Sequence, residues 1–316
     1  MAFDFNGISA PFRMQPGLRR LAAGCQQLTP TRPGDRVLTE KLAVLDKHPT
    51  QALLVRSGFD ARPALKALFD QAAAEHPDAW HRERGGRACA LRLGWSVHND
   101  RVARIGPEAS ASVGRCLEAL PGNWRAAALF CLAFAEDFAV IEGDSACIPW
   151  LAVCLPSHWA PENKIGRHFA EVHAPVADNQ LLIAASEHLA RLVTGDDRWQ
   201  RQVWTITRHP HLQAHPARVD PADWPPDADA DQLAEIACFR TEQQTFIPLA
   251  GHRQAIFTIR VELQPLTLAI ADPTHAQRLH DALQSMSDAV LAYRSLSTAR
   301  DRLLDWLHRR STGRIA

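Results

Sequence analysis

The sequence has 316 residues, of which 46% are hydrophobic and 22% are charged, and its formal net charge is zero. A chain of this length and composition buries a sizeable core in one or two domains. Because neither sign of charge predominates, composition gives no indication of a nucleic-acid or anionic-lipid partner, and the longest apolar run, residues 126–135, is about half the roughly 20 residues that cross a bilayer.

The first half of the chain predicts mainly helices. Residues 1–35 are rich in proline and predict an extended lead-in. A helix begins at Asp60 with a proline early in its first turn, and it ends at His76-Pro77. A second helix over residues 123–137 is apolar on most sides, which predicts that it is deeply packed.

The middle of the chain predicts two short antiparallel strands over residues 138–142 and 150–155, joined through Gly143-Asp144. A helix follows from Asp178 or Asn179 to Val193. Residues 209–231 combine His, Pro, Asp and Ala and predict a long loop, which in a compact domain is either functional or mobile.

Alternation of apolar and polar residues predicts strands over residues 203–208, 239–247 and 257–263, and the last two form a hairpin about Gly251. Two C-terminal helices are predicted, one capped at Asp272 and the other at Ser297. Hairpin-linked strands with helices gathered at the ends predict the α+β class with an antiparallel sheet. We expect the lead-in (1–35) to precede a single domain (36–316), with a helical part over about 36–137, a sheet-containing part over about 138–270, and C-terminal helices over 272–311.

His173 is the first candidate site residue. The segment before it has helical spacing, and Pro175, two residues on, disfavours further helix, so the histidine is held at a bend. A metal ligand needs a neutral imidazole whose other ring nitrogen is oriented by a hydrogen bond. A histidine that caps a helix or lies in the core explains the pattern equally, so both interpretations stay open.

The predicted hairpin carries the second candidate set. If the loop turns symmetrically about Gly251, Glu242 lies opposite Arg260, Arg240 opposite Glu262, and Gln244 opposite Thr258. Such a set is either a solvent-facing charge ladder or the wall of a polar pocket. In a pocket, Arg240, Glu242 and Arg260 would position a substrate amine or relay protons.

Other residues give weaker indications. His209, His211 and His215 are compatible with zinc but also with incidental loop histidines. Trp204 is either core or a stacking surface. The seven cysteines form no CxxC pair, which favours reduced thiols in a cytoplasmic protein. We find no HExxH, GxSxG, P-loop or Rossmann motif, nor any apolar leader segment.

Several motifs in order along the chain resemble the haem-binding (alpha) subunit family of bacterial haem-dependent oxidative N-demethylase. They are Phe12–Leu18, Ala135–Ile141, Cys154–Ser157 with Trp159 and Pro161, Lys164–Gly166, His173–Val176, Trp204, Arg240–Thr245 and Phe257–Arg260. The resemblance implies a PAS-like antiparallel sheet flanked by helices, with N- and C-terminal helical extensions.

The resemblance further implies a haem b in this chain, with His173 as its iron ligand and Lys164 and Trp204 as further cofactor contacts. The implied activity is O2-dependent N-demethylation of a small secondary amine. NADPH would feed electrons through FMN and a [2Fe–2S] cluster on partner reductase subunits, and no nucleic acid or membrane would take part. The alternatives are a PAS-like module that binds haem or a small ligand without turnover, and a partner-binding protein without a cofactor.

Overall fold

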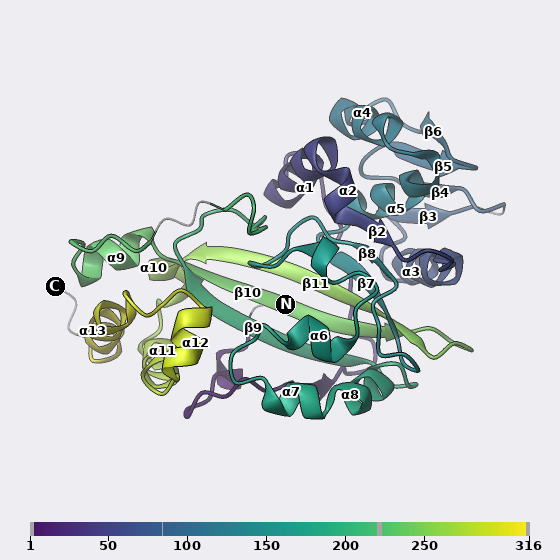
Figure 1. The fold of residues 1–316 in the computed structure, drawn as a ribbon. Coiled ribbons are helices and arrows are strands. Elements are labelled where there is room, and N and C mark those ends of the chain that lie inside the picture. The colour runs from purple at the N-terminus through teal and green to yellow at the C-terminus, as the bar shows by residue number, and fades with distance from the viewer. Residues whose placement is uncertain (1–2, 84, 220–222, 314–316) are drawn as a thin grey trace.

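The structure is a computed structural model that describes residues 3–83, 85–219 and 223–313. Its centre is a seven-stranded sheet in the order β1-β9-β10-β11-β7-β8-β2, and β3 to β6 form a separate four-stranded sheet in chain order (Figure 1). Every pair of neighbouring strands is antiparallel. The strands are β1 Arg19–Arg20, β2 Leu53–Val55, β3 Trp80–Arg82, β4 Ala88–Ala90, β5 Trp95–His98, β6 Arg101–Arg104, β7 Asp137–Glu142, β8 Trp150–Ala152, β9 Trp199–Thr207, β10 Cys238–Pro248 and β11 Gln254–Pro265.

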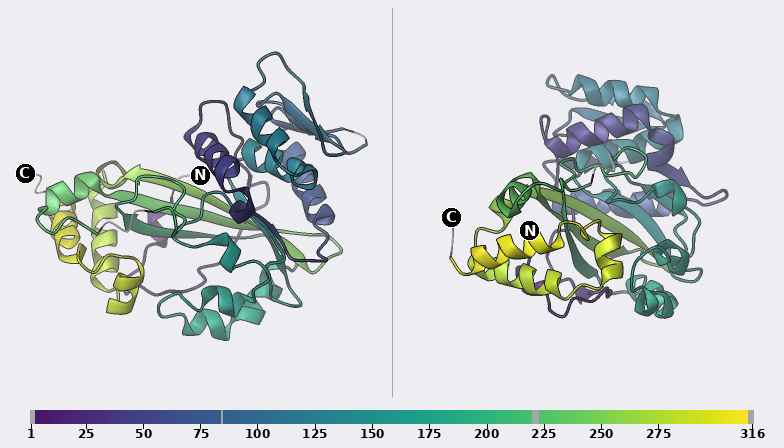
Figure 2. Two further views of the ribbon diagram at one scale, coloured as in Figure 1. Left: turned by 45° about the horizontal axis from the view of Figure 1, so that its top comes forward. Right: turned by 60° about the vertical axis from the view of Figure 1, so that its left-hand side comes forward.

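Helices gather at both ends of the large sheet and across one of its sides (Figures 1 and 2). The predicted α+β class with an antiparallel sheet is therefore confirmed, whereas the likeness to a PAS fold stays a prediction. The helices are η1 Phe5–Gly7, α1 Arg36–Lys47, α2 Pro49–Ala52, α3 Arg62–Glu75, α4 Ala111–Ala119, α5 Gly122–Ala133, η2 Pro161–Asn163, α6 Phe169–His173, α7 Gln180–Ala184, α8 Ser186–Val193, α9 Ala230–Ile236, α10 Leu266–Ala269, α11 Pro273–Gln284, α12 Asp288–Tyr293 and α13 Arg300–Ser311.

Helix α5 is buried along nearly its whole length, as its apolar sequence predicts. It ends at Ala133 and not at Asp137, because the residues after it pair with the lead-in. Phe134 is extended and forms a bridge with Pro30, and the Ala135 amide donates to the Thr29 carbonyl at 2.8 Å. A contact between segments 100 residues apart thus ends the helix early.

The two sides of the large sheet are chemically different. The front face carries Arg201, Glu242, Gln244 and Phe257, and α6 to α8 lie on it; α6 crosses β9 and β10 in Figure 1. The back face carries, among others, Trp204, Gln243, Thr245, Thr258 and Arg260. Residues directly opposite one another in an antiparallel pair point to the same side, so the register of β9, β10 and β11 fixes this division.

The register of the β10–β11 hairpin differs from the prediction by one residue. Glu242 lies opposite Val261, and Arg260 lies opposite Gln243. The Leu249 amide bonds the Gln254 carbonyl, so the loop comprises residues 250–253 and its centre is the bond between Gly251 and His252. The shift of one residue moves Arg260 and Glu262 to the back face, away from Arg240 and Glu242.

The C-terminal helices pack at one end of the sheet and enclose a second core around Trp204, Phe239, Leu279 and Trp306. Asp272 caps α11 as predicted, because its side chain accepts the Thr274 amide at 2.8 Å. The predicted cap at Ser297 is wrong: residues before Arg300 form a turn against buried Leu296, and α13 begins at Arg300.

Several segments differ from expectation. The part predicted as helical, about 36–137, also contains strands β2 to β6. Helices α9 and α12 were not predicted, and the helix expected up to Val193 is divided at Ala185 into α7 and α8. Of the leucines in this segment, Leu182 and Leu189 are buried, whereas Leu181 is 61% exposed. Among the described residues, no helix is long and apolar enough to cross a membrane.

Candidate functional site

The short helix α6 ends on His173, as the sequence predicts. A capping box begins it: the His168 ring accepts the Ala170 amide at 3.1 Å, and Glu171 accepts the His168 amide at 3.2 Å. Reciprocal caps of this kind stabilise a helix too short to persist alone.

The His173 ring is oriented by its own helix. Its Nδ1 lies 2.9 Å from the Phe169 carbonyl oxygen, and the two rings are 4.1 Å apart at their centroids. A carbonyl only accepts hydrogen bonds, so Nδ1 carries the proton and the lone pair lies on Nε2. Burial, together with the charges of Arg201 and Lys164, lowers the pKa of His173 to about 4 against the opposing effect of this hydrogen bond. The ring is therefore neutral near pH 7, the form that binds a metal.

Lys164 fixes the position of α6. Its ammonium donates to the Val172 carbonyl at 2.5 Å, one residue before His173. Ile165 packs against the front-face cluster of Ala139, Leu151 and Val153. Gly166 has a φ of +69°, which glycine adopts without strain, and its amide donates to the Ile148 carbonyl at 2.7 Å. The Lys164-Ile165-Gly166 motif is thus an anchor for the helix that carries His173.

Arg201 is a site residue that sequence reasoning missed. It lies on β9, on the front face, and its charge reaches His173. Its Nε is buried without a hydrogen-bond partner among the described residues, and burial lowers its pKa although the charge of Glu242 opposes this. The alternation in the sequence placed the strand start at Val203, whereas β9 begins four residues earlier and includes Arg201.

Glu242 also lies on the front face. Its carboxylate accepts a hydrogen bond from the side-chain amide of Gln244 at 2.5 Å. Its charge opposes the lowering of the Arg201 and Arg240 pKa values that burial causes. The front face therefore combines a neutral imidazole, a partly buried cation and a carboxylate.

Arg240 is fully buried and holds two loops together. Its guanidinium donates to the Ser157 hydroxyl at 2.8 Å and to the Leu212 carbonyl at 2.6 Å, with longer bonds to the His211 and Pro156 carbonyls. Burial lowers its pKa to about 10, so it stays charged near neutral pH. With its donors occupied in this way, Arg240 supports the site through the loops that it fixes.

The structure does not bring the other two predicted residues to His173. Arg260 points to the back face, where it pairs with Glu262 at 2.5 Å and donates to the Thr29 hydroxyl at 3.1 Å. Trp204 is buried on the back face in the core of the C-terminal helices, and Arg294 stacks on its ring at 5.2 Å. The core interpretation of Trp204 therefore fits its surroundings.

The loop histidines do not converge on one point. His209 bonds the Gln213 carbonyl at 2.8 Å through Nε2, whereas His215 is buried and bonds Glu162 at 3.1 Å. These contacts hold the loop after β9 in place, in agreement with the interpretation of His209 and His215 as incidental loop histidines.

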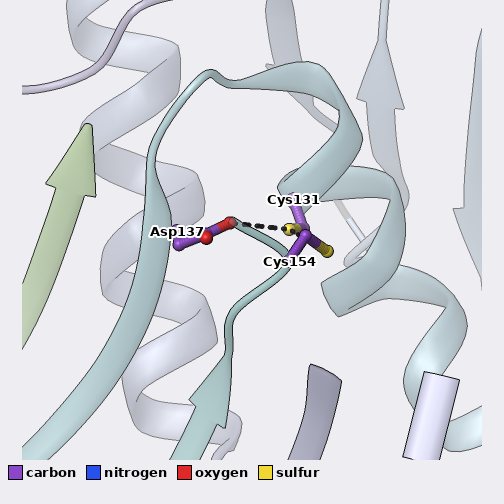
Figure 3. Close-up of side chains that lie close together, drawn as sticks. All are labelled: Cys131, Asp137 and Cys154. Atoms are coloured by element: carbon purple, nitrogen blue, oxygen red, sulfur yellow. Dashed lines mark hydrogen bonds between the residues drawn. The ribbon is translucent and has the colours of Figure 1, made fainter. Parts of the chain in front are cut away.

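A buried cluster of potential metal ligands lies between α5 and β8 (Figure 3). The Sγ atoms of Cys131 and Cys154 are 3.8 Å apart, and Asp137 lies beside them, with one ligand atom of each within 4.8 Å of the others. The Lys41 ammonium lies 3.1 Å from Asp137 and 3.6 Å from the Cys131 sulfur. A protein cation thus already occupies the position that a metal ion would take, and we assign the cluster a structural role.

The front face is the arrangement best suited to a cofactor. Among the described residues it offers one neutral nitrogen whose lone pair has no partner, and a partly buried guanidinium whose buried Nε lacks an acceptor. Together these groups fit a metal-containing group that carries acidic substituents. Comparison with known families gives a match over residues 36–304 to the family described as "Haem-dependent oxidative N-demethylase, alpha subunit-like".

Proposed function

Because this chain belongs to the haem-dependent oxidative N-demethylase alpha-subunit-like family, we propose that it is the haem-carrying subunit of an enzyme that demethylates a small secondary amine. The observation that carries the proposal is the His173 ring, whose Nδ1 proton is bonded to the Phe169 carbonyl so that Nε2 is left free. Haem-ligating histidines need this orientation and tautomer.

The described residues fit the proposed haem b. His173 would hold the iron through Nε2, and Arg201 would donate to a propionate, which supplies the acceptor that its buried Nε lacks in the protein. Lys164 would act through α6, because its ammonium is bonded to the Val172 carbonyl. The PAS-like likeness predicted from the sequence is part of this proposal.

When bound, haem b supplies the O2-dependent oxidation of a C–H bond adjacent to nitrogen. For dimethylamine the balance is one amine, one O2, two electrons and two protons, giving methylamine, formaldehyde and water. Glu242 is the front-face carboxylate suited to bind the substrate ammonium and to accept its proton, since it forms no ion pair within 4 Å among the described residues. Arg240, two residues before Glu242 on β10, holds the loops at residues 156–158 and 211–212 in place.

We infer that the electrons come from NADPH through FMN and a [2Fe–2S] cluster on separate subunits. The family description "alpha subunit" supports a complex of several chains, and the cysteines of this chain lack iron–sulfur spacing. NADPH dependence makes the cytoplasm the expected location.

The visible spectrum of the purified protein, reconstituted with haem, tests the cofactor. We expect a Soret band in the wild type that is lost in His173→Ala and restored by added imidazole, which would occupy the space of the missing ring. His209→Ala is the matched control and should keep the band, because the His209 ring bonds the Gln213 carbonyl in a loop away from α6. A wild type without a Soret band, or His173→Ala with an unchanged one, would contradict the assignment.

Turnover separates the enzyme from a binding or sensing module. With a reductase and NADPH supplied, we expect formaldehyde to form from dimethylamine, and Glu242→Gln to reduce its rate by a factor of about 100 or more, the usual contribution of a group that transfers protons. A stable haem complex that releases no formaldehyde from any small amine would favour the non-enzymatic alternative.

A further inference from the structure

A cavity lies on the back face of the large sheet, on the opposite side of the sheet from His173. Its volume is about 210 Å³, and it opens between strands β10 and β11 and the lead-in segment at residues 26–29. Its polar lining includes Thr29, Glu136, Gln243, Thr258 and Arg260. Because the sheet separates it from His173, it is not part of the front-face site.

Glu136 is the unusual group in this cavity. Its side chain is nearly inaccessible, with 2% of the residue exposed, and one carboxylate oxygen accepts the Thr29 amide at 2.9 Å. No arginine, lysine or histidine of the described chain forms an ion pair with it. A buried carboxylate without a cation is costly, and burial accordingly raises the pKa of Glu136.

The neighbouring charges are already paired with one another. The Lys41 ammonium donates to the Glu136 backbone carbonyl at 2.6 Å, but its ion-pair partner is Asp137 at 3.1 Å. Arg260 is paired with Glu262 at 2.5 Å. Of the charged residues that line the cavity, Glu136 is then the one without an ion-pair partner within the described chain.

Other groups in the lining offer further acceptors. The Thr245 and Thr258 hydroxyls lie 2.6 Å apart, and Gln27 donates to Thr245 at 2.9 Å. The half-buried Gln243 side chain also lines this space, and its amide includes an acceptor oxygen. A ligand that donates hydrogen bonds therefore finds several acceptors here. The volume is below the range of about 300–1,000 Å³ that drug-sized ligands need.

We propose that this cavity binds a small organic ammonium ion that carries N–H groups, with its charge against Glu136 and its N–H groups shared among Glu136, Gln243 and the threonine hydroxyls. An anion is disfavoured, because Arg260 is already neutralised by Glu262 and the uncompensated charge is negative. The proposal depends neither on haem binding at His173 nor on turnover at the front face.

Titration of the haem-free full-length protein with methylammonium, followed by calorimetry and by the midpoint of thermal unfolding, tests this site. We expect saturable binding and a raised midpoint in the wild type. Glu136→Gln should weaken binding at least tenfold, and since the Gln carbonyl oxygen still accepts the Thr29 amide, the variant should remain folded. Glu262→Gln is the matched control: it removes a carboxylate at the Arg260 side of the cavity but leaves Glu136, and should change the affinity by less than Glu136→Gln does.

Two further probes make the result decisive. Tetramethylammonium, which has no N–H group, should bind at least tenfold more weakly than methylammonium, and acetate should not bind. His173→Ala should bind methylammonium like the wild type, which distinguishes this cavity from the front-face site. Absence of saturable methylammonium binding, equal binding by Glu136→Gln, or preference for acetate would overturn the proposal.

Discussion

The His173 imidazole is neutral in the folded protein because it is desolvated and lies near two cations. In the unfolded chain its pKa returns to about 6.5. Between pH 6.5 and about 4 the unfolded state therefore binds more protons than the folded state, so acidification through this window reduces the free energy of unfolding. Above pH 6.5 the imidazole is neutral in both states, and its titration no longer affects stability.

We expect the free energy of unfolding of the haem-free protein to decrease as the pH falls from 6.5 to 4, and His173→Gln to show a smaller decrease. Chemical denaturation at half-unit pH intervals measures both curves. Subtracting one curve from the other cancels the remaining groups, such as His158, whose pKa is also lowered to about 4. Identical slopes for the two proteins would show that His173 titrates normally.

Arg201 should contribute more to haem affinity than Arg260, the arginine that the structure places on the opposite face of the sheet. A hydrogen bond to a charged group is worth about 1.5–3 kcal/mol, so Arg201→Met should weaken haem binding by about 10- to 150-fold. Arg260→Met, which removes the same kind of side chain from the back face, should leave the affinity within about twofold. Competition for haem with apomyoglobin gives both values, and equal losses would place the cofactor elsewhere.

At the scale of elements, Arg240 connects strand β10 to two loops that also bond one another. The His158 amide donates to the Ala214 carbonyl at 2.8 Å, and the Ala214 amide donates to the Pro156 carbonyl at 2.9 Å. The guanidinium satisfies three carbonyls and one hydroxyl in these loops. The loops are therefore held together through one buried side chain.

Replacing Arg240 with Met should free both loops without unfolding the sheet. We expect the amides of His158 and Ala214 to exchange with deuterium about 10- to 100-fold faster, the equivalent of one lost charge-assisted bond. Arg208→Met, which removes a half-buried arginine bonded to the Asp223 carbonyl, is the control. Unchanged exchange at residues 156–158 and 211–214 would mean that other contacts hold the loops.

For the whole molecule, the ion pair of Lys41 and Asp137 joins the N-terminal helices to the large sheet. Both side chains are essentially inaccessible; Lys41 also donates to three backbone carbonyls, and Asp137 accepts the Leu155 amide at 2.6 Å. Removing one partner of a buried pair costs about 3–5 kcal/mol, because the other charge is left uncompensated.

Lys41→Met should therefore lower the free energy of unfolding by about 3–5 kcal/mol, and Lys41→Met combined with Asp137→Asn should cost less than the sum of the two single variants. Lys66→Met removes an exposed helical ion pair with Asp70 and should cost at most about 0.5 kcal/mol. Urea denaturation of the four variants measures these free energies. If the losses of the two single variants simply add in the double variant, Lys41 and Asp137 do not stabilise one another.

The sequence predicted features that depend on short-range pattern. The end of α6 at His173, the long hairpin and the cap at Asp272 follow from proline, alternation and capping chemistry, which act within a few residues. It could not predict the hairpin register, because a shift of half a residue in the loop centre reverses the side on which Arg260 lies. Nor could it predict the early end of α5 or the position of Arg201 beside His173, which depend on contacts between distant segments.

Strand β9 is covered only in part by the short strand β1 at the edge of the large sheet. Strand β1 pairs with β9 through Arg19 and Arg20 alone, opposite Gln200 and Trp199. Farther along, the Gln202 side chain accepts the Asp4 amide at 2.9 Å and the Trp204 carbonyl accepts the Arg294 guanidinium at 2.9 Å. These contacts cover the edge of β9, which could otherwise pair with a strand from another molecule. Shortening the lead-in should consequently favour self-association before it affects any chemistry.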